Sequence, residues 1–258
     1  MKLMAAAKSK LAAAVLRRIA RSDKYTNLFI KLLRKLFELR YQEEWVNATA
    51  APHFYDQRHN VMSLAFGNAA YGPYVFYRGF YTSEVIEKDD KVLDIGSGDG
   101  FFTMRFYATK ASKVDGIDIE DSAIEMARTT NQNSKTAFLK CDAIREPFPD
   151  TNYDVIVFDG AIGHISKEDS KILLKKIKDN LSPTGIFVGS ESLGHEGHDH
   201  LQFFDTLDDL KTFFLPYFSY ISFKSIDYNI SASFQRKEAY WRCSNAPERI
   251  EKHSWKNI

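Results

Sequence analysis

The sequence predicts an α/β fold with a mostly parallel sheet, and three observations support this. From Lys91 onward, short apolar segments alternate with amphipathic helical segments, which is the pattern of parallel strands whose helices cover both faces of a sheet. The first apolar segment, Val92–Ile95, runs directly into a glycine-rich turn. The second ends at an acid, Asp118, and a helical segment follows it. In open parallel sheets, ligands bind where such strands end.

Length and composition fit one globular domain with an extension. The chain has 258 residues, of which 44% are hydrophobic and 27% are charged, and this is enough to build a sizeable core. Cys141 and Cys243 lie far apart and lack metal-binding spacing, so we expect both to be reduced in an intracellular protein. No apolar run approaches the roughly 18 residues that a membrane span needs.

The charge is distributed unevenly along the chain. Residues 1–40 hold eleven Lys and Arg against two acids, a net charge of +9, and the rest of the chain holds 24 basic and 32 acidic side chains, a net charge of −8. The acidic body argues against a nucleic-acid partner. The basic charge is concentrated in residues 1–46, which we expect to form an amphipathic helical extension.

Two helical segments make up this extension. Leu11, Val15 and Ile19 recur at helical spacing in the first segment. One face of the second segment carries Leu28, Phe29, Leu32, Leu33, Leu36 and Phe37. Such helices can pack on the body, contact a partner subunit of a homo-oligomer, or lie on an anionic membrane surface. The stretch up to Ser22, rich in Arg and Ala and free of acids, also matches a mitochondrial transit peptide.

The spacing of the glycines after the first strand indicates which kind of ligand the loop can bind. A dinucleotide-binding loop has the pattern G-x-G-x-x-G, whose last glycine lets the helix pack closely on the strand. Here the glycines are Gly96, Gly98 and Gly100, and the position of that last glycine is filled by Phe101. The pattern therefore disfavours a dinucleotide.

The segment from Val92 to Phe102 resembles motif I of the class I S-adenosylmethionine-dependent methyltransferases, an apolar strand and an acid followed by G-x-G-x-G. The resemblance implies a Rossmann-like class I methyltransferase fold over residues 89–245, with a seven-stranded, mostly parallel sheet and a C-terminal antiparallel hairpin. It also implies S-adenosyl-L-methionine as the cofactor. The cofactor-binding residues that it implies are Asp94, Gly96, Ser97, Gly98, Gly100, Asp118, Ile119, Asp142, Ala143 and Asp159.

Two of these acids have specific expected roles. Asp118 ends the second predicted strand, Lys113–Ile119, and follows Asp94 at close to the spacing expected for a ribose-binding acid. Its carboxylate can accept hydrogen bonds from both ribose hydroxyls. An acid there would also stabilise the N-terminus of the following helix without any ligand. Asp142 and Ala143, after the third strand, resemble the pair that reads the adenine edge, although an Asp also starts turns for local reasons.

The resemblance also implies where the acceptor binds. His164 follows the fourth predicted strand, near the expected position of the transferred methyl group, and His200 lies in a polar loop similar to the acceptor-binding segment of methyltransferases for small molecules and sugars. We expect His164 first, and His200 second, to act as the general base, and the alternative for either is a hydrogen-bonded residue that positions the acceptor. Tyr77 and Arg78, in the aromatic segment 47–88 that covers the site in this family, and His198 are the expected substrate contacts. The spacing of the loop histidines is not a firm zinc pattern, so no metal site is expected.

The remaining elements follow from local patterns. Pro73 predicts a helix over residues 73–87. Further along, the patterns predict a strand over Ala137–Ala143, a strand from Tyr153, a helix over Lys167–Asn180, a turn over Leu181–Gly185 and a strand over Ile186–Ser190. Tyr220–Tyr228 and Glu238–Cys243 are expected as the hairpin strands, joined by a polar connection that contains Ser231 and Arg236. Residues 246–258 are expected to be a polar tail without regular structure.

The expected function is methyl transfer from S-adenosylmethionine to a small polar acceptor, chiefly a hydroxyl of a sugar or glycan precursor. One alternative is an O-methyltransferase assisted by a divalent metal held by Asp159 and the 195–200 loop. Another alternative is a non-catalytic scaffold that binds the cofactor. The basic extension suggests a cytoplasmic protein that can lie at the inner face of a membrane.

Overall fold

The computed structural model describes residues 12–41, 74–195, 200–231, 234–253 and 255. The predictions for His198, Pro73 and residues 1–11 and 42–73 lie outside this part of the chain. Cys141 and Cys243 are both buried and unpaired. Among the described helices, none combines the length and apolar character that crossing a bilayer requires.

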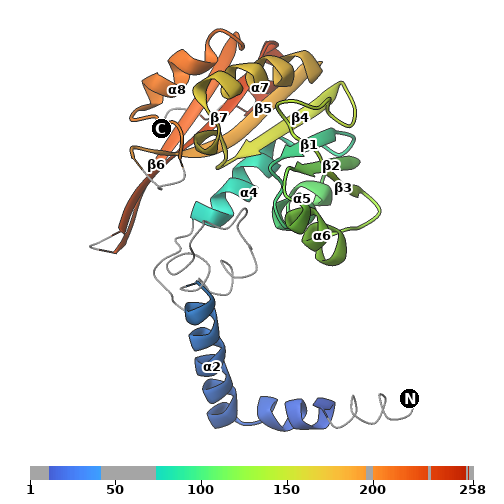
Figure 1. The fold of residues 1–258 in the computed structure, drawn as a ribbon, viewed down its shortest axis with the longest axis vertical. Coiled ribbons are helices and arrows are strands. Elements are labelled where there is room, and N and C mark those ends of the chain that lie inside the picture. The colour runs from blue at the N-terminus through green and yellow to red at the C-terminus, as the bar shows by residue number, and fades with distance from the viewer. Residues whose placement is uncertain (1–11, 42–73, 196–199, 232–233, 254, 256–258) are drawn as a thin grey trace.

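A seven-stranded mixed sheet forms the centre of the body (Figure 1). In spatial order its strands are β3 (Thr136–Lys140), β2 (Lys113–Asp118), β1 (Lys91–Ile95), β4 (Tyr153–Asp159), β5 (Leu181–Leu193), β7 (Phe234–Ser244) and β6 (Tyr220–Ser231). The first five are parallel, whereas β7 is antiparallel to both of its neighbours. The predicted fold class, including the terminal hairpin, is confirmed.

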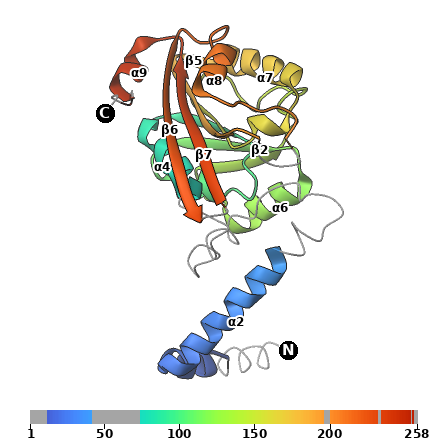
Figure 2. The same cartoon turned by 90° about the vertical axis from the view of Figure 1, so that its left-hand side faces the viewer.

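Helices cover both faces of this sheet. They are α4 (Tyr74–Val85), α5 (Phe101–Arg105), α6 (Asp121–Thr130), α7 (Lys167–Asn180), α8 (Leu207–Phe214) and α9 (Pro247–His253). One core cluster joins α7 and α8 to the sheet through side chains such as Leu173 and Phe214, and a second joins α4 and α9 to the opposite face through Val85 and Ile250. Figure 2 shows these pairs of helices on either side of the long strands. From Val155 to Phe158, successive residues of β4 point alternately into the two clusters, as the geometry of a strand requires.

The order in which the chain adds strands to the sheet reverses between β1 and β4. From β1 the chain steps outward to β2 and β3, and it then returns to the other side of β1 to form β4 and β5. A crevice opens at such a switch point, at the carboxyl ends of the strands. The loops after β1, β2 and β4 therefore meet at one edge of the sheet.

Three local predictions are wrong. The expected turn Leu181–Gly185 is the beginning of β5, because Leu181 pairs with Tyr153 before the ladder shifts register. Ser231 and Arg236, expected in a connection, lie in β6 and β7, since their backbones continue the antiparallel ladder as far as the pair Ser231–Phe234.

The third concerns the C-terminal tail, which contains the helix α9. Pro247 occupies its first turn, where a missing N–H costs nothing. Ile250 is buried against the sheet, and the Arg249 guanidinium donates to Asp90 at 2.5 Å and to the Asp154 carbonyl at 2.7 Å. These tertiary contacts stabilise a helix that its polar composition alone does not predict.

The N-terminal extension is helical, as predicted, in its described part. Residues 12–20 form one helix and α2 (Asp23–Tyr41) follows after a short break. At the break, the Thr26 hydroxyl donates to the Ile19 carbonyl at 3.0 Å.

The turn after β1 sets a steric limit that can be tested. Gly100 has φ +73°, and a Cβ there would lie 2.5 Å from Phe138 Cζ and 3.0 Å from Ala127 Cβ. We expect Gly100→Ala to lower the free energy of unfolding by about 2–4 kcal/mol, since both the backbone and the packing are strained. Urea denaturation measures this change.

Gly194→Ala is the matched control for this prediction. Gly194 also has a positive φ, +93°, but no described atom lies within 4 Å of a Cβ built there. We expect a loss of about 1 kcal/mol, from the backbone alone. Equal losses in the two variants would show that Phe138 yields to the added methyl group.

Candidate active site

The glycine loop after β1 is tied to the end of β2. Gly96, Gly98 and Gly100 have φ values of +70°, +54° and +73°, a region that glycine adopts without strain. The N–H groups of Gly96 and Ser97 donate to the Ile117 carbonyl at 2.8 and 3.0 Å. The loop therefore turns sharply and presents its backbone at the edge of the sheet, where the sequence predicted a ligand.

Asp118 stands opposite this loop with both oxygens oriented by backbone donors. Its Oδ2 accepts from the Gly98 N–H at 2.9 Å and its Oδ1 from the Glu120 N–H at 3.0 Å. Burial raises the pKa of Asp118, and these N–H groups partly oppose the rise. Each carboxylate oxygen can accept more than one hydrogen bond, so this carboxylate could still receive two ribose hydroxyls.

Asp94 is a second buried carboxyl in the same crevice. The Thr103 hydroxyl donates to its Oδ2 at 2.5 Å. The pKa of Asp94 is raised to about 8, chiefly by burial; the Thr103 hydrogen bond opposes the rise, and the charges of Asp159 and Asp118 contribute to it. The three carboxyls thus interact electrostatically across one space, and a cation placed there would be stabilised.

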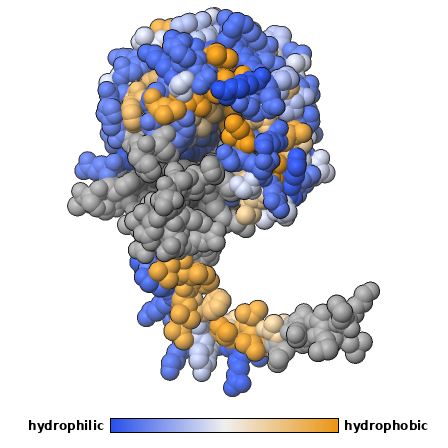
Figure 3. Space-filling model, in the orientation of Figure 1, coloured by the Kyte–Doolittle hydropathy of each residue, from blue (hydrophilic) through white to orange (hydrophobic). Residues whose placement is uncertain are grey.

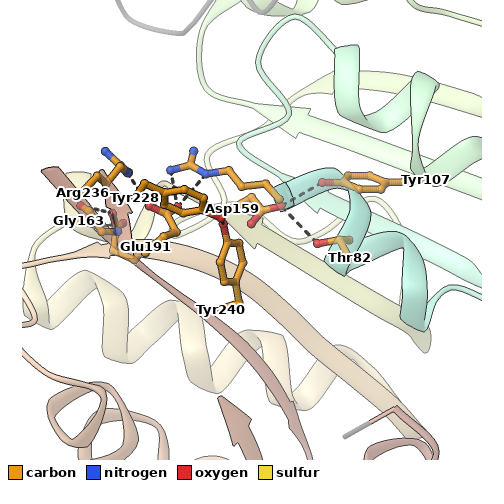
Figure 4. Close-up of polar contacts among 11 residues, drawn as sticks. Thr82, Tyr107, Asp159, Gly163, Glu191, Tyr228, Arg236 and Tyr240 are labelled. Atoms are coloured by element: carbon orange, nitrogen blue, oxygen red, sulfur yellow. Dashed lines mark hydrogen bonds and ion pairs between the residues drawn. The ribbon is translucent and has the colours of Figure 1, made fainter. Parts of the chain in front are cut away.

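Asp159 ends β4 and is the third of these acids. The Tyr107 hydroxyl donates to its Oδ2 at 3.1 Å and the Thr82 hydroxyl at 3.3 Å, and Figure 4 shows both side chains directed at this carboxylate. Burial raises its pKa, whereas the positive charge of Arg78 and the Ser190 hydroxyl lower it. The acid is thereby held in a fixed orientation at the exit of β4.

The residues around this crevice fit S-adenosylmethionine. The Ser97 Oγ is buried and has no hydrogen-bond partner among the described residues, so a polar ligand atom could satisfy it. Ile119, next to Asp118, is 54% exposed and could cover one face of an adenine ring. The sulfonium and ammonium groups of this cofactor are cations, and they match the three carboxyls.

Asp142 has a local role that the sequence left open. Its Oδ1 accepts the N–H groups of Ile144 and Arg145 at 2.9 and 3.1 Å, and its Oδ2 accepts from the Arg145 side chain at 2.8 Å. Partial burial would raise the pKa of Asp142, but the effect of these hydrogen bonds is larger, so its pKa is lowered. The N–H of Ala143 donates to no described residue, so it could bind the adenine edge.

The two predicted catalytic histidines lie together. The rings of His164 and His200 are edge to face with centroids 4.5 Å apart. The segment around His200 is held by the N–H of Leu201 and by the Gln202 side chain, which donate to the carbonyls of Gly163 and Ile162 at 2.8 and 2.7 Å. Two histidines that are far apart in the sequence therefore form one cluster beside the exit of β4.

The predicted substrate residue Arg78 belongs to an ion-pair network that sequence reasoning missed. Its Nε and Nη2 donate to Glu238 Oε1 at 3.0 and 2.8 Å, and Arg236 Nε donates to Oε2 at 2.6 Å. Burial alone would raise the pKa of Glu238, but the two arginines lower it, so the glutamate is ionised. A side chain at Gly160 would collide with the Arg78 guanidinium, which therefore reaches the β4 exit.

Aromatic side chains extend this network toward solvent. Tyr77 stacks on Tyr81 with centroids 5.6 Å apart and lies 6.0 Å from Tyr228. The hydroxyls of Tyr228 and Tyr240 are 3.0 Å apart, and Figure 4 shows Tyr228 beside Arg236. Arg78 is thus close to the β4 exit, and Tyr77, the next residue of α4, packs on Tyr81 and Tyr228.

A pattern in the sequence of β7 could have indicated the network residues that sequence reasoning missed. Polar side chains recur at every second position of β7, at Arg236, Glu238, Tyr240 and Arg242. Period-two polarity in a strand marks a face with polar partners, and here the partners of Glu238 and Arg242 include residues of α4. Among the described residues, no group of three His, Cys, Asp or Glu side chains could hold a metal ion; His198 is not one of those residues.

Comparisons with known proteins agree with this geometry. Residues 86–212 match the family model described as a methyltransferase domain. Phosphoethanolamine N-methyltransferase of Plasmodium falciparum is 36% identical over 104 residues, which are 40% of this chain and 39% of the relative. N-terminal Xaa-Pro-Lys N-methyltransferase 1 of Ailuropoda melanoleuca is 30% identical over 108 residues, 41% of this chain and 48% of the relative. The matches thus span less than half the length of these curated relatives.

A solved structure shows the same fold. Phosphoethanolamine N-methyltransferase 2 of Haemonchus contortus, in complex with phosphomonomethylethanolamine and S-adenosylhomocysteine, has a TM-score of 0.58 at 14% identity, covering 74% of this chain and 59% of that one. Together with the family model, this confirms the resemblance to the class I S-adenosylmethionine-dependent methyltransferases and the expected cofactor.

The pKa of Asp94 predicts how cofactor affinity depends on pH. The carboxyl is mostly protonated below pH 8 in the free protein, and a nearby cation favours its ionised form. We expect S-adenosylmethionine to bind roughly 10- to 50-fold more tightly at pH 8 than at pH 6, with close to one proton released per molecule bound at the lower pH. Calorimetry in buffers of different ionisation enthalpy measures both quantities.

Two controls separate this linkage from general effects of pH. Asp94→Asn should remove most of the pH dependence, because the amide does not titrate. Adenosine, which carries neither the sulfonium nor the ammonium group, should bind with little change between pH 6 and pH 8. A pH-independent affinity of the unaltered protein for S-adenosylmethionine would contradict the assignment of Asp94.

Proposed function

We propose that this protein, whose residues 86–212 form a class I S-adenosylmethionine-dependent methyltransferase domain, methylates a small polar acceptor whose nucleophilic atom must lose a proton. The observation that carries the proposal is the contact between His164 and His200 at the β4 exit, next to the crevice of the three carboxyls. The bound cofactor supplies an activated methyl group, so the chain's main task is to align and deprotonate the acceptor.

In this proposal, residues of three loops hold the cofactor. The loop of Gly96 and Gly98 gives close backbone approach, and Asp118 accepts hydrogen bonds from ribose. Asp94 and Asp159 supply negative charge where the cofactor is positive. These assignments rest on the geometry described above and on the family to which the domain belongs.

His164 is the proposed proton acceptor, and His200 supports it. A neutral imidazole can take a proton from an acceptor hydroxyl, which makes histidine the most frequent general base in enzymes. Ring contact at 4.5 Å restricts the orientation of both imidazoles. Arg78 and Tyr77 form the proposed opposite wall, where they would contact polar groups of the acceptor.

A sugar hydroxyl remains our first candidate for the acceptor atom, because the loop that carries His195 and His200 is polar and suited to hydroxyl groups. An amine is the second candidate, because both curated relatives named above are N-methyltransferases. An amine also needs a base, since its protonated form has no lone pair to attack with. Sugars and primary amines tested side by side with labelled cofactor distinguish the two.

The two alternatives from the sequence make different predictions. A metal-assisted O-methyltransferase would lose activity in the presence of a chelator and regain it with Mg²⁺. A scaffold would bind the cofactor and methylate nothing in any acceptor pool.

We further propose that the protein works in the cytoplasm beside a membrane, because its N-terminal helices combine exposed apolar side chains with many basic ones.

The cofactor assignment predicts a selective titration. We expect saturable binding of S-adenosylmethionine and of its demethylated product, no binding of NAD, and at least a 10-fold loss of affinity in Asp118→Ala, which removes the proposed ribose contact. Isothermal calorimetry measures all four. Asp121→Ala is the control, since Asp121 begins α6, shortly after Asp118, but pairs with Lys140 on the surface. A folded protein that binds neither adenosyl ligand would exclude the proposed reaction.

The base assignment predicts a specific loss of turnover. His164→Asn should lower kcat by about 10²- to 10⁴-fold, the usual contribution of a general base, with cofactor affinity within threefold of the unaltered protein. The acidic limb of the pH–rate profile should disappear in the same variant. His253→Asn is the control, because His253 lies on α9 and contacts Glu87. Retained kcat with an unchanged pH profile would show that His164 only shapes the pocket.

A further inference from the structure

We propose that residues 12–41, hereafter the arm, dock on an anionic lipid surface through one face of α2. The arm comprises the helix over residues 12–20 and α2. It lies outside the methyltransferase domain, and the inference does not depend on which reaction that domain catalyses.

The first observation is an exposed apolar face. At 100° per residue, six side chains of α2 fall on an arc of about 100°, the spacing of one face of a helix. All six are between 44% and 60% exposed: Tyr25, Leu28, Phe29, Leu32, Leu36 and Leu39. In the preceding helix, Val15 and Leu16 are also more than half exposed. Singly exposed apolar side chains are ordinary, but a continuous face of this kind indicates a binding surface.

The second observation is the position of the basic side chains. Lys35, Lys24 and Lys31 follow one another beside one border of the apolar arc, and Arg34 lies on the opposite side of α2. Figure 3 shows hydrophobic atoms along one side of the arm and hydrophilic side chains projecting from the other. Long basic side chains at the border of an apolar face can keep their charges at the headgroups while the apolar face enters the bilayer.

Within the described residues, the arm makes no polar contact with the body. Its side-chain hydrogen bonds and ion pairs join arm residues to each other, as between Thr26 and Ile19 or between Glu38 and its neighbours Arg34 and Lys35. The apolar face is therefore not fixed against the methyltransferase domain by any polar interaction described here.

Charge favours a lipid surface over a second copy of the arm. Residues 12–41 contain eight Lys and Arg and only Asp23 and Glu38 as acids, a net charge of +6. Two arms packed face to face would bring two such charges together, and this is unfavourable. An anionic bilayer offers both the opposite charge and an apolar interior. Residues 41–258, with a net charge of −8, would be repelled by the same surface, so the body would remain in solution.

The test is sedimentation of the full-length protein with vesicles. We expect binding to vesicles in which phosphatidylcholine and phosphatidylglycerol are mixed at a molar ratio of about 7 to 3, and at least 10-fold weaker binding to pure phosphatidylcholine. Bound protein should be released when NaCl rises from about 50 to about 500 mM. Lys31→Gln with Lys35→Gln should weaken binding by roughly 10- to 30-fold. Leu32→Gln with Leu36→Gln, which leaves the charge unchanged, should weaken it by at least 10-fold.

The matched control removes two equally exposed apolar side chains from the body. Ile172 on α7 and Leu215 after α8 are 53% and 55% exposed, and Ile172→Gln with Leu215→Gln should leave vesicle binding unchanged. Thermal denaturation confirms that all variants are folded. Equal binding to neutral vesicles, or no effect of the α2 substitutions, would overturn the proposal. So would a concentration-dependent dimer that the α2 substitutions abolish in the absence of lipid, because it would identify a second copy as the occupant.

Discussion

The burial of three carboxyl groups at one edge of the sheet is the constraint on which this structure depends. Asp94, Asp118 and Asp159 end or nearly end β1, β2 and β4, so the parallel topology brings them together. Burial raises the pKa of each, which means that it disfavours their charge. Taking carboxylates out of water costs stability unless donors or cations compensate. Backbone N–H groups and hydroxyls compensate in part, and a cationic cofactor would complete the balance. The crevice thus favours binding at the expense of stability.

A second network, between α4 and β7, determines the other wall of the site. Arg78 and Arg236 share the buried carboxylate of Glu238, and Arg242 donates to Glu84 at 2.6 Å and to the Tyr81 carbonyl at 2.9 Å. Removing one member of a buried ion pair leaves an uncompensated charge, so these contacts fix α4 on the terminal hairpin. Because Arg78 also reaches the β4 exit, the position of α4 and the shape of the acceptor side depend on each other.

Sequence reasoning succeeded where a local pattern carries the structure. The alternation of apolar and amphipathic segments predicted the parallel sheet, and the glycine spacing together with Asp118 indicated the cofactor. Sequence reasoning failed where contacts between residues far apart in the sequence determine the structure. Nothing near Arg249 shows that Asp90, 159 positions away, will pair with it, and so the sequence predicts a tail where α9 forms. Glu238 was missed for the same reason, because its partner Arg78 lies 160 positions earlier.

The residues of the candidate site divide into those inside and those outside the matched domain, and this division is relevant to acceptor specificity. The matched methyltransferase domain, residues 86–212, contains the three carboxyls, the glycine loop and His164. Arg78, Arg236 and Glu238 all lie outside it. The proposed cofactor side of the crevice thus lies within the matched domain, whereas the proposed acceptor wall of α4 and the hairpin lies outside it. Since neither curated match spans half of its relative, the acceptors of those relatives do not follow from the shared domain. The charge pattern of Arg78, Arg236 and Glu238 is therefore the part of the site that should distinguish one acceptor from another.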